Sequence, residues 1–252
     1  MKNQKRKLLN KKFDESDTLA DAGLKCHLQE EGENMFYLVI DLEMCNVPRN
    51  YREKTYKYAK ETIQIGAVLL DEDFKRIGTL TQYVQPEFGV IDHFIERLTG
   101  IRNSQLKNAP KLQEALLHML NWIGDREYKI YAWSESDRNQ ILHEMKAKKI
   151  DDVRITSFVE KEKWIDYQSV FMKRFDFNRP ISLAEALERA EIEPEGKFHD
   201  GLDDAVNTGH LIKKLELNSE YQLVQYELSG EESKSLSCTL GELFSGLDLH
   251  FV

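Results

Sequence analysis

Two carboxylates end an apolar run near the start of the chain. The run reads FYLVIDLEM from Phe36 to Met44, a composition typical of a buried β-strand. Because side chains alternate along a strand, Asp41 and Glu43 share one face, and the other face is wholly apolar. Two adjacent carboxylates repel each other, and a divalent cation would offset that repulsion by binding their oxygens. The alternative is a strand end that reaches the surface, with both acids solvated.

A third acid follows a later strand. Residues Lys129 to Trp133 form a short apolar run, and Asp137 comes four residues after it, where a helix is expected to begin. Ligands bind at the carboxyl ends of strands in α/β sheets, which makes Asp137 a candidate for the same site. A lone acid at a helix N-terminus is also explained by the helix dipole alone.

A histidine and a fourth acid stand together late in the chain. The sequence HDGLDD runs from His199 to Asp204, where a loop leads into an apolar-periodic helix. This spacing puts an imidazole on a loop beside a carboxylate that a helix holds in place. The alternative makes Asp200 or Asp203 a helix cap and His199 a surface residue.

The elements that must position these residues predict an α/β fold. Three strands come in succession, at residues 36–44, 62–70 and 78–85, without a long helix between them, which predicts an antiparallel meander. Helices then alternate with a fourth strand at 129–133 and a short fifth strand at 155–158. The last helix is expected at about 202–215. We therefore expect a mixed five-stranded central sheet, an antiparallel meander followed by parallel strands, flanked by helices.

Together these residues resemble the three motifs of the DEDDh exonuclease family, the DnaQ-like branch of the RNase H-like fold. The first motif is Asp41-x-Glu43, the second is Asp137, and the third is His199-xxxx-Asp204. The sequence ETIQIGAV, residues 61–68, is similar to the family's second strand, and LTGI, residues 98–101, to the segment before its second motif. The run GLDD is similar to the branch of the histone-mRNA exonuclease and the bacterial sporulation-inhibitor-type exonuclease. The resemblance covers about residues 36–216.

The resemblance implies a 3′-to-5′ exonuclease that releases nucleoside 5′-monophosphates with two divalent ions, Mg²⁺ or Mn²⁺. The implied metal ligands are Asp41, Glu43, Asp137 and Asp204, with Asp41 between the two ions. Glu43 and Asp204 would help to hold the ion that carries the attacking water, and Asp137 would act mainly on the other side. His199 would be the general base, since imidazoles titrate near neutral pH.

The implied substrate is nucleic acid with a free 3′ end, single-stranded RNA or DNA. Six residues are implied to line the pocket for the terminal nucleotide: Leu42, Met44, Leu98, Thr99, Gly100 and Ile101. The basic segment from Asn46 to Lys60 is expected to contact the strand, through its Lys and Arg side chains and through Tyr51, Tyr56 or Tyr58, or else to be a solvated loop. Trp133 is expected to pack in the core.

One position departs from that branch. Many of its members carry an aromatic residue directly before the second-motif Asp, and this chain has Ser136. Which residue, if any, supplies a second surface for base stacking is therefore open, and the resemblance gives weaker support to a preference for RNA.

Composition bounds the remaining possibilities. The 252 residues are 41% hydrophobic and 31% charged, with a net charge of −9, which argues against a surface that grips nucleic acid throughout. No run approaches the roughly 18 apolar residues of a membrane span, so no membrane is expected. Three widely spaced cysteines favour the reducing cytoplasm. No phosphate-binding glycine motif is present, so an ATP-driven motor or a dinucleotide enzyme has no support.

The chain is expected to divide into three parts. Residues 1–34 form a charged leader, 35–216 the exonuclease domain and 217–252 an acidic C-terminal extension. From Glu216 to Val252 there are seven acids and one lysine, together with apolar residues that suit a protein partner or docking onto the domain itself. Two other functions stay open, a non-catalytic binding module with the same fold and a two-metal enzyme that acts on nucleotides or short oligonucleotides.

Overall fold

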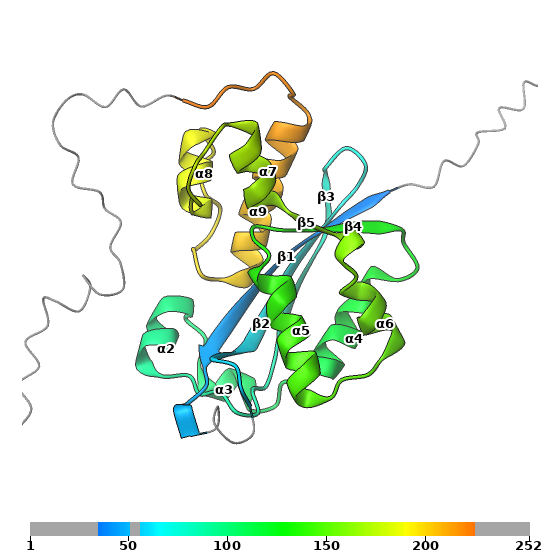
Figure 1. The fold of residues 1–252 in the computed structure, drawn as a ribbon, viewed down its shortest axis with the longest axis vertical. Coiled ribbons are helices and arrows are strands. Elements are labelled where there is room, and N and C mark those ends of the chain that lie inside the picture. Colours follow the sequence, from blue (N-terminus) through cyan, green and yellow to red (C-terminus); the bar gives the residue numbers. More distant parts are fainter. Residues whose placement is uncertain (1–34, 51–55, 225–252) are drawn as a thin grey trace, which may run out of the picture. The chain divides into compact units, whose positions relative to one another are not determined.

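The computed structural model describes residues 35–50 and 56–224. Within these described residues, five strands form one sheet in the spatial order β3-β2-β1-β4-β5 (Figure 1). The strands are β1 (Phe36–Asn46), β2 (Lys60–Leu70), β3 (Arg76–Tyr83), β4 (Tyr128–Ala132) and β5 (Trp164–Asp166). The first three pair antiparallel, and β4 and β5 join β1 in parallel. The predicted mixed sheet is confirmed, and β1 is its central strand.

Helices cover both faces of this sheet (Figure 1). Apolar side chains of α4, α5 and α6 form one core with β1, whereas α7, α8 and α9 form a second core on the opposite face. The helices are α2 (His93–Thr99), α3 (Asn103–Leu106), α4 (Leu112–Ile123), α5 (Ser136–Lys148), α6 (Val153–Phe158), α7 (Tyr167–Arg174), α8 (Leu183–Arg189) and α9 (Gly201–Glu216), with a 3₁₀ turn, η1 (Lys161–Lys163).

The fifth strand lies elsewhere than predicted. The segment 155–158 belongs to helix α6, and β5 lies at Trp164–Asp166. Asp152 starts α6, because its side chain accepts hydrogen bonds from the backbone N–H groups of Arg154 and Ile155. Ile155 and Phe158 are three residues apart, so they lie on one helical face and both enter the core. A run of four residues is too short to distinguish that pattern from a strand.

Alternation along β1 determines which way the acids point. Leu38, Ile40 and Leu42 pack into the core with α4 and α5, and Val39 packs into the core with α9. Asp41 and Glu43 follow Val39 on the α9 face, where the apolar core ends. A register irregularity in the pairing with β2 comes directly after Glu43. The acids therefore stand between the end of one core and the start of α9.

Glycines let α9 begin directly on the sheet. Gly66 on β2 faces the first turn of α9 so closely that a Cβ there would overlap the carbonyl of Gly201 and the nitrogen of Leu202. A Cβ at Gly201 would lie 3.2 Å from the carbonyl oxygen of Asp41. The close approach of backbone to backbone, which only glycine allows, places the first turn of α9 beside the acids of β1.

The described part of the predicted C-terminal extension packs on the domain. Tyr221 and Leu223 contact the core that α7, α8 and α9 form, and the Tyr221 hydroxyl donates to the carbonyl of Ala190 at 2.9 Å. The predicted leader, 1–34, and the rest of the extension, 225–252, lie outside the described residues. No described helix has both the length and the apolar content that crossing a bilayer requires.

We expect Gly66→Ala to destabilise the fold by about 1–3 kcal/mol, because the added methyl group has no room against the α9 backbone. The matched control is Gly209→Ala, inside α9, where the nearest atom to a new Cβ lies 3.8 Å away. Since alanine favours a helix interior by up to about 1 kcal/mol over glycine, the control should be neutral or stabilising. Urea unfolding measures both. Equal stability of the two variants would contradict the close contact between the backbones of β2 and α9.

Candidate active site

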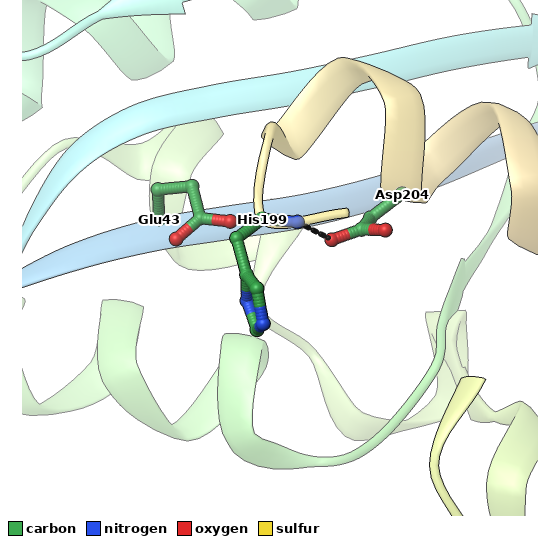
Figure 2. Close-up of side chains that lie close together, drawn as sticks. All are labelled: Glu43, His199 and Asp204. Atoms are coloured by element: carbon green, nitrogen blue, oxygen red, sulfur yellow. Dashed lines mark hydrogen bonds between the residues drawn. The ribbon is translucent and has the colours of Figure 1, made fainter. Parts of the chain in front are cut away.

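Glu43, His199 and Asp204 come together where β1 meets the start of α9. Each offers one ligand atom, and these atoms lie within 4.8 Å of one another. Figure 2 shows Glu43 and Asp204 flanking the backbone of His199. Both carboxylates are buried, with 8% of each residue exposed, and the histidine is exposed. The arrangement gives two buried carboxyl groups and one imidazole that solvent can reach.

The loop that carries His199 is held by the acids of α9. The backbone N–H of His199 donates to Asp204 Oδ2 at 2.8 Å (Figure 2), and the backbone N–H of Lys197 donates to Asp203 Oδ2 at 2.7 Å. His199 has φ of 65°, a left-handed conformation that is uncommon outside glycine. Asp200 caps α9 by accepting from the N–H of Leu202 at 3.0 Å.

One oxygen of Asp204 is buried and unsatisfied. Oδ2 accepts from His199, but Oδ1 has no hydrogen-bond partner among the described residues. A buried carboxylate oxygen without a donor is unfavourable. A cation bound next to Asp204 would satisfy Oδ1, and the nearby oxygens of Glu43 add a second hard ligand. The donor set of this site therefore fits a divalent metal ion.

Asp137 joins the site from the first turn of α5. It is buried, and its Oδ1 accepts from the backbone N–H of Leu42 at 3.1 Å, between the two acids of β1. The serine before it, Ser136, donates to Oδ2 at 3.4 Å. This bond between α5 and β1 confirms that Asp137, 94 residues after Glu43 in the sequence, lies at the same end of the strand.

Burial raises the pKa values of all four acids, and neighbouring carboxylates add to the rise for Asp41, Glu43 and Asp204. Burial raises the pKa of Glu43 to about 8, and Asp204 and Asp200 add to it. Burial raises the pKa of Asp137 to about 7, against the opposing hydrogen bond from Leu42. The pKa of Asp41 is raised by burial and then by Asp137 and Asp204, and that of Asp204 by burial. A bound cation would stabilise the charged form of these buried acids.

The predicted pocket residues are buried to different extents. Leu42 is a core residue, and Met44 is half-buried against the same core. Thr99 and Ile101 are buried, and the Thr99 hydroxyl accepts from the Ile101 backbone N–H at 3.0 Å. Leu98 is half-buried, and Gly100 is exposed at the end of α2. Of the six predicted residues, Met44, Leu98 and Gly100 are therefore the ones whose side chain or backbone is open to solvent.

The basic segment contributes less aromatic surface than predicted. Tyr56 is buried and stacks on Phe88, so it cannot reach a nucleic-acid base. Tyr58 is half-buried and stacks on His143 of α5 with 4.2 Å between the ring centroids. Tyr51 lies outside the described residues.

The expectation that Trp133 packs in the core is confirmed by the described contacts. Trp133 packs against the core of α7 to α9, and its indole N–H donates to the carbonyl of Ile181 at 3.3 Å. Cys45, beside the site in sequence, is buried among isoleucines and Leu106.

Two residues near the acids were not anticipated. Gln64 of β2 stands opposite Glu43 in the strand pairing and contacts the start of α9. Lys197 carries a positive charge that opposes the rise in the pKa of Glu43, and its Nζ lies 3.6 Å from where a Cβ would stand at Gly100. Cross-strand register would have indicated Gln64, but register is known only once the strands are paired.

Comparisons with known proteins agree with this geometry. A model of the Exonuclease family (RNase_T) matches residues 38–212, more than half of the chain. Human ERI1 exoribonuclease 2 is 29% identical over 204 residues, covering 71% of this chain and 28% of its own length. Rat 3′-5′ exoribonuclease 1 is 24% identical over 214 residues, covering 81% of this chain and 60% of its own length. This chain thus spans less than two thirds of the length of each of these relatives.

A solved structure has the same fold. The nuclease domain of 3′hExo, described as a DEDDh family member bound to rAMP, superposes with a TM-score of 0.60 at 20% identity. The alignment covers 76% of this chain and 97% of that one. The range that the family model matches, residues 38–212, contains most of β1 and most of α9, and hence the four predicted metal ligands and His199. This chain therefore belongs to the Exonuclease family, and its fold is that of a DEDDh nuclease domain.

Proposed function

We propose that this protein is a metal-dependent 3′-to-5′ exonuclease that removes nucleoside 5′-monophosphates from a free 3′ end. The observation that carries the proposal is the buried, partly unsatisfied acid group of Glu43 and Asp204 beside His199. Membership of the Exonuclease family supports it. Two similar proteins are named exoribonucleases, and the similar solved structure has rAMP bound.

Four carboxylates would hold two divalent ions, Mg²⁺ or Mn²⁺: Asp41, Glu43, Asp137 and Asp204. Bound divalent ions neutralise phosphate charge and make water a stronger nucleophile. The raised pKa values of the acids favour cation binding, since binding replaces protons or relieves repulsion between the acids.

His199 accepts a proton from the attacking water. Its ring is exposed at the edge of the acid group, and its backbone is held by Asp204, so it can reach a substrate phosphate without displacing a buried residue. The water oxygen forms a bond to phosphorus while the bond from phosphorus to the 3′ oxygen of the preceding nucleotide breaks. That oxygen takes a proton to become the new 3′-hydroxyl. The terminal nucleotide leaves as a 5′-monophosphate.

The substrate is a single strand of RNA or DNA. The segment 98–101, with Met44, forms the wall that receives the terminal nucleotide, and Lys197 provides a positive charge next to Gly100 for the strand's phosphates. Half-buried apolar groups such as Leu98 pack on a base of any identity, which suits removal of successive nucleotides without sequence preference.

Replacing Asp41 or Asp204 by asparagine should abolish the stepwise shortening of a 5′-labelled strand from its 3′ end. Each substitution keeps the size of the side chain but removes a negative charge from the cation site. Glu72→Gln, at an exposed acid between β2 and β3, is the control and should keep full activity. Trimming by either aspartate variant at the wild-type rate would refute the assignment.

Replacing His199 by glutamine should lower kcat by about 10²–10⁴-fold, because general-base catalysis contributes about that much. Metal affinity, measured by Mn²⁺ titration calorimetry, should stay close to that of the wild type. An unchanged kcat would remove His199 from the base role. A large loss of Mn²⁺ affinity would make it a metal ligand instead.

Without metal, the protein should become less stable as pH rises. The pKa of Glu43 is raised from 4.5 to about 8 and that of Asp137 from 3.8 to about 7. The folded state therefore binds more protons than the unfolded state between these values, so their contribution to stability is present at low pH and lost as pH approaches 8. Thermal unfolding in EDTA at about pH 5.5 and about pH 8 measures the slope.

Excess Mn²⁺ should reduce that slope, since the bound cation replaces the protons. The control is Glu43→Gln, which removes one of the titrating groups and should flatten the slope in EDTA. Stability that rises with pH in EDTA, or a slope unchanged by Mn²⁺, would contradict the acid group as a cation site.

A further inference from the structure

Gln64 connects β2 to the start of α9. Its side chain is wholly buried, and the residue stands opposite Glu43 in the antiparallel pairing of β1 and β2. Gln64 Oε1 accepts from the backbone N–H of Gly201 at 2.9 Å. On the other side of the amide, Nε2 lies 3.5 and 3.4 Å from the two carboxylate oxygens of Asp200. One amide thus contacts both residues that follow His199.

The junction that Gln64 holds determines where His199 stands. His199 is exposed and has a left-handed backbone, so burial does not hold its ring in place. Its own N–H is tied to Asp204. Among the described residues, Gln64 is the side chain of the sheet that hydrogen-bonds to Asp200 and Gly201. Loss of this connection would free the loop on the side that faces β2.

We propose that Gln64 is a positioning residue, whose neutral amide locks the His199–Gly201 junction onto β2. This inference rests on the proposed function, because the group being positioned is the proposed general base. The requirement for an amide follows from the partners, since Gly201 offers a donor and Asp200 offers acceptors. A side chain that both accepts and donates satisfies them together.

A carboxylate at position 64 would have nearly the same shape and the wrong charge. Gln64→Glu keeps an oxygen for the N–H of Gly201 but loses the donor to Asp200, and it places a new negative charge beside Asp200 and Glu43. Adding Asp200→Asn reverses the direction of the hydrogen bond between positions 64 and 200, because the asparagine amide then donates to the new carboxylate. Asparagine also caps helices as well as aspartate does, so the start of α9 is kept.

The test compares Gln64→Glu, Asp200→Asn and the double variant with the wild type. On a 5′-labelled single strand with Mn²⁺, we expect Gln64→Glu to lower kcat by about tenfold or more with little change in KM, since small displacements of a reacting group have effects of this size. Asp200→Asn should lose less. The double variant should recover most of the kcat that Gln64→Glu loses, which a role in packing alone would not allow.

Hydrogen exchange gives a second readout that needs no activity. Because the new charge repels Asp200 and opens the junction, the amide of Gly201 should exchange faster in Gln64→Glu than in the wild type. It should return toward the wild-type rate in the double variant. Wild-type kcat and exchange in Gln64→Glu would overturn the proposal, as would a folded double variant no better than Gln64→Glu. If the wild type itself cuts no strand, the proposed function fails, whereas the exchange data still decide whether Gln64 holds the junction.

Discussion

The close approach of α9 to the backbone of the sheet is the contact on which the site depends. Gly201 lies against the carbonyl of Asp41 and the nitrogen of Gly66, with no side chain between them. This contact brings Asp204, one turn into α9, level with the acids of β1. A helix held one side-chain diameter farther away would leave Asp204 and Glu43 too far apart to share a cation.

The acid group costs folding energy, and that cost is compatible with its proposed role. Asp41, Glu43, Asp137 and Asp204 have pKa values raised by burial, and one oxygen of Asp204 has no partner among the described residues. A protein selected for stability alone would place apolar residues here. Departures from local stability rules occur mostly at functional sites, where a ligand supplies the missing interaction.

Much of the site could be predicted because it rests on short-range patterns. Alternation along one strand put Asp41 and Glu43 on a common face, and the structure confirms that this face meets α9. The order of the three motifs identified the family, which the match over residues 38–212 confirms. Five strands in a mixed sheet followed from the run of elements.

Other features depend on contacts that the sequence does not encode locally. The segment 155–158 was predicted to be a strand, because four residues are too few to show whether Ile155 and Phe158 share a helical face or belong to a short strand. In the sequence Gln64 looks like an ordinary strand residue, but strand pairing puts it opposite Glu43 and its amide within hydrogen-bonding distance of Asp200. The side chain of Leu42 is buried in the core, and its role in a substrate pocket stays a prediction. The individual roles of the site residues and a cytoplasmic location stay predictions.

The most direct test of the account is the chemical identity of the first product. A single strand with a free 3′-hydroxyl would be incubated with the protein and Mn²⁺ in water enriched in ¹⁸O, and the products analysed by mass spectrometry. The account predicts nucleoside 5′-monophosphates that carry one ¹⁸O atom on the phosphate, released from the 3′ end. Nucleoside 3′-monophosphates, internal fragments or a 5′-phosphate without ¹⁸O would contradict it.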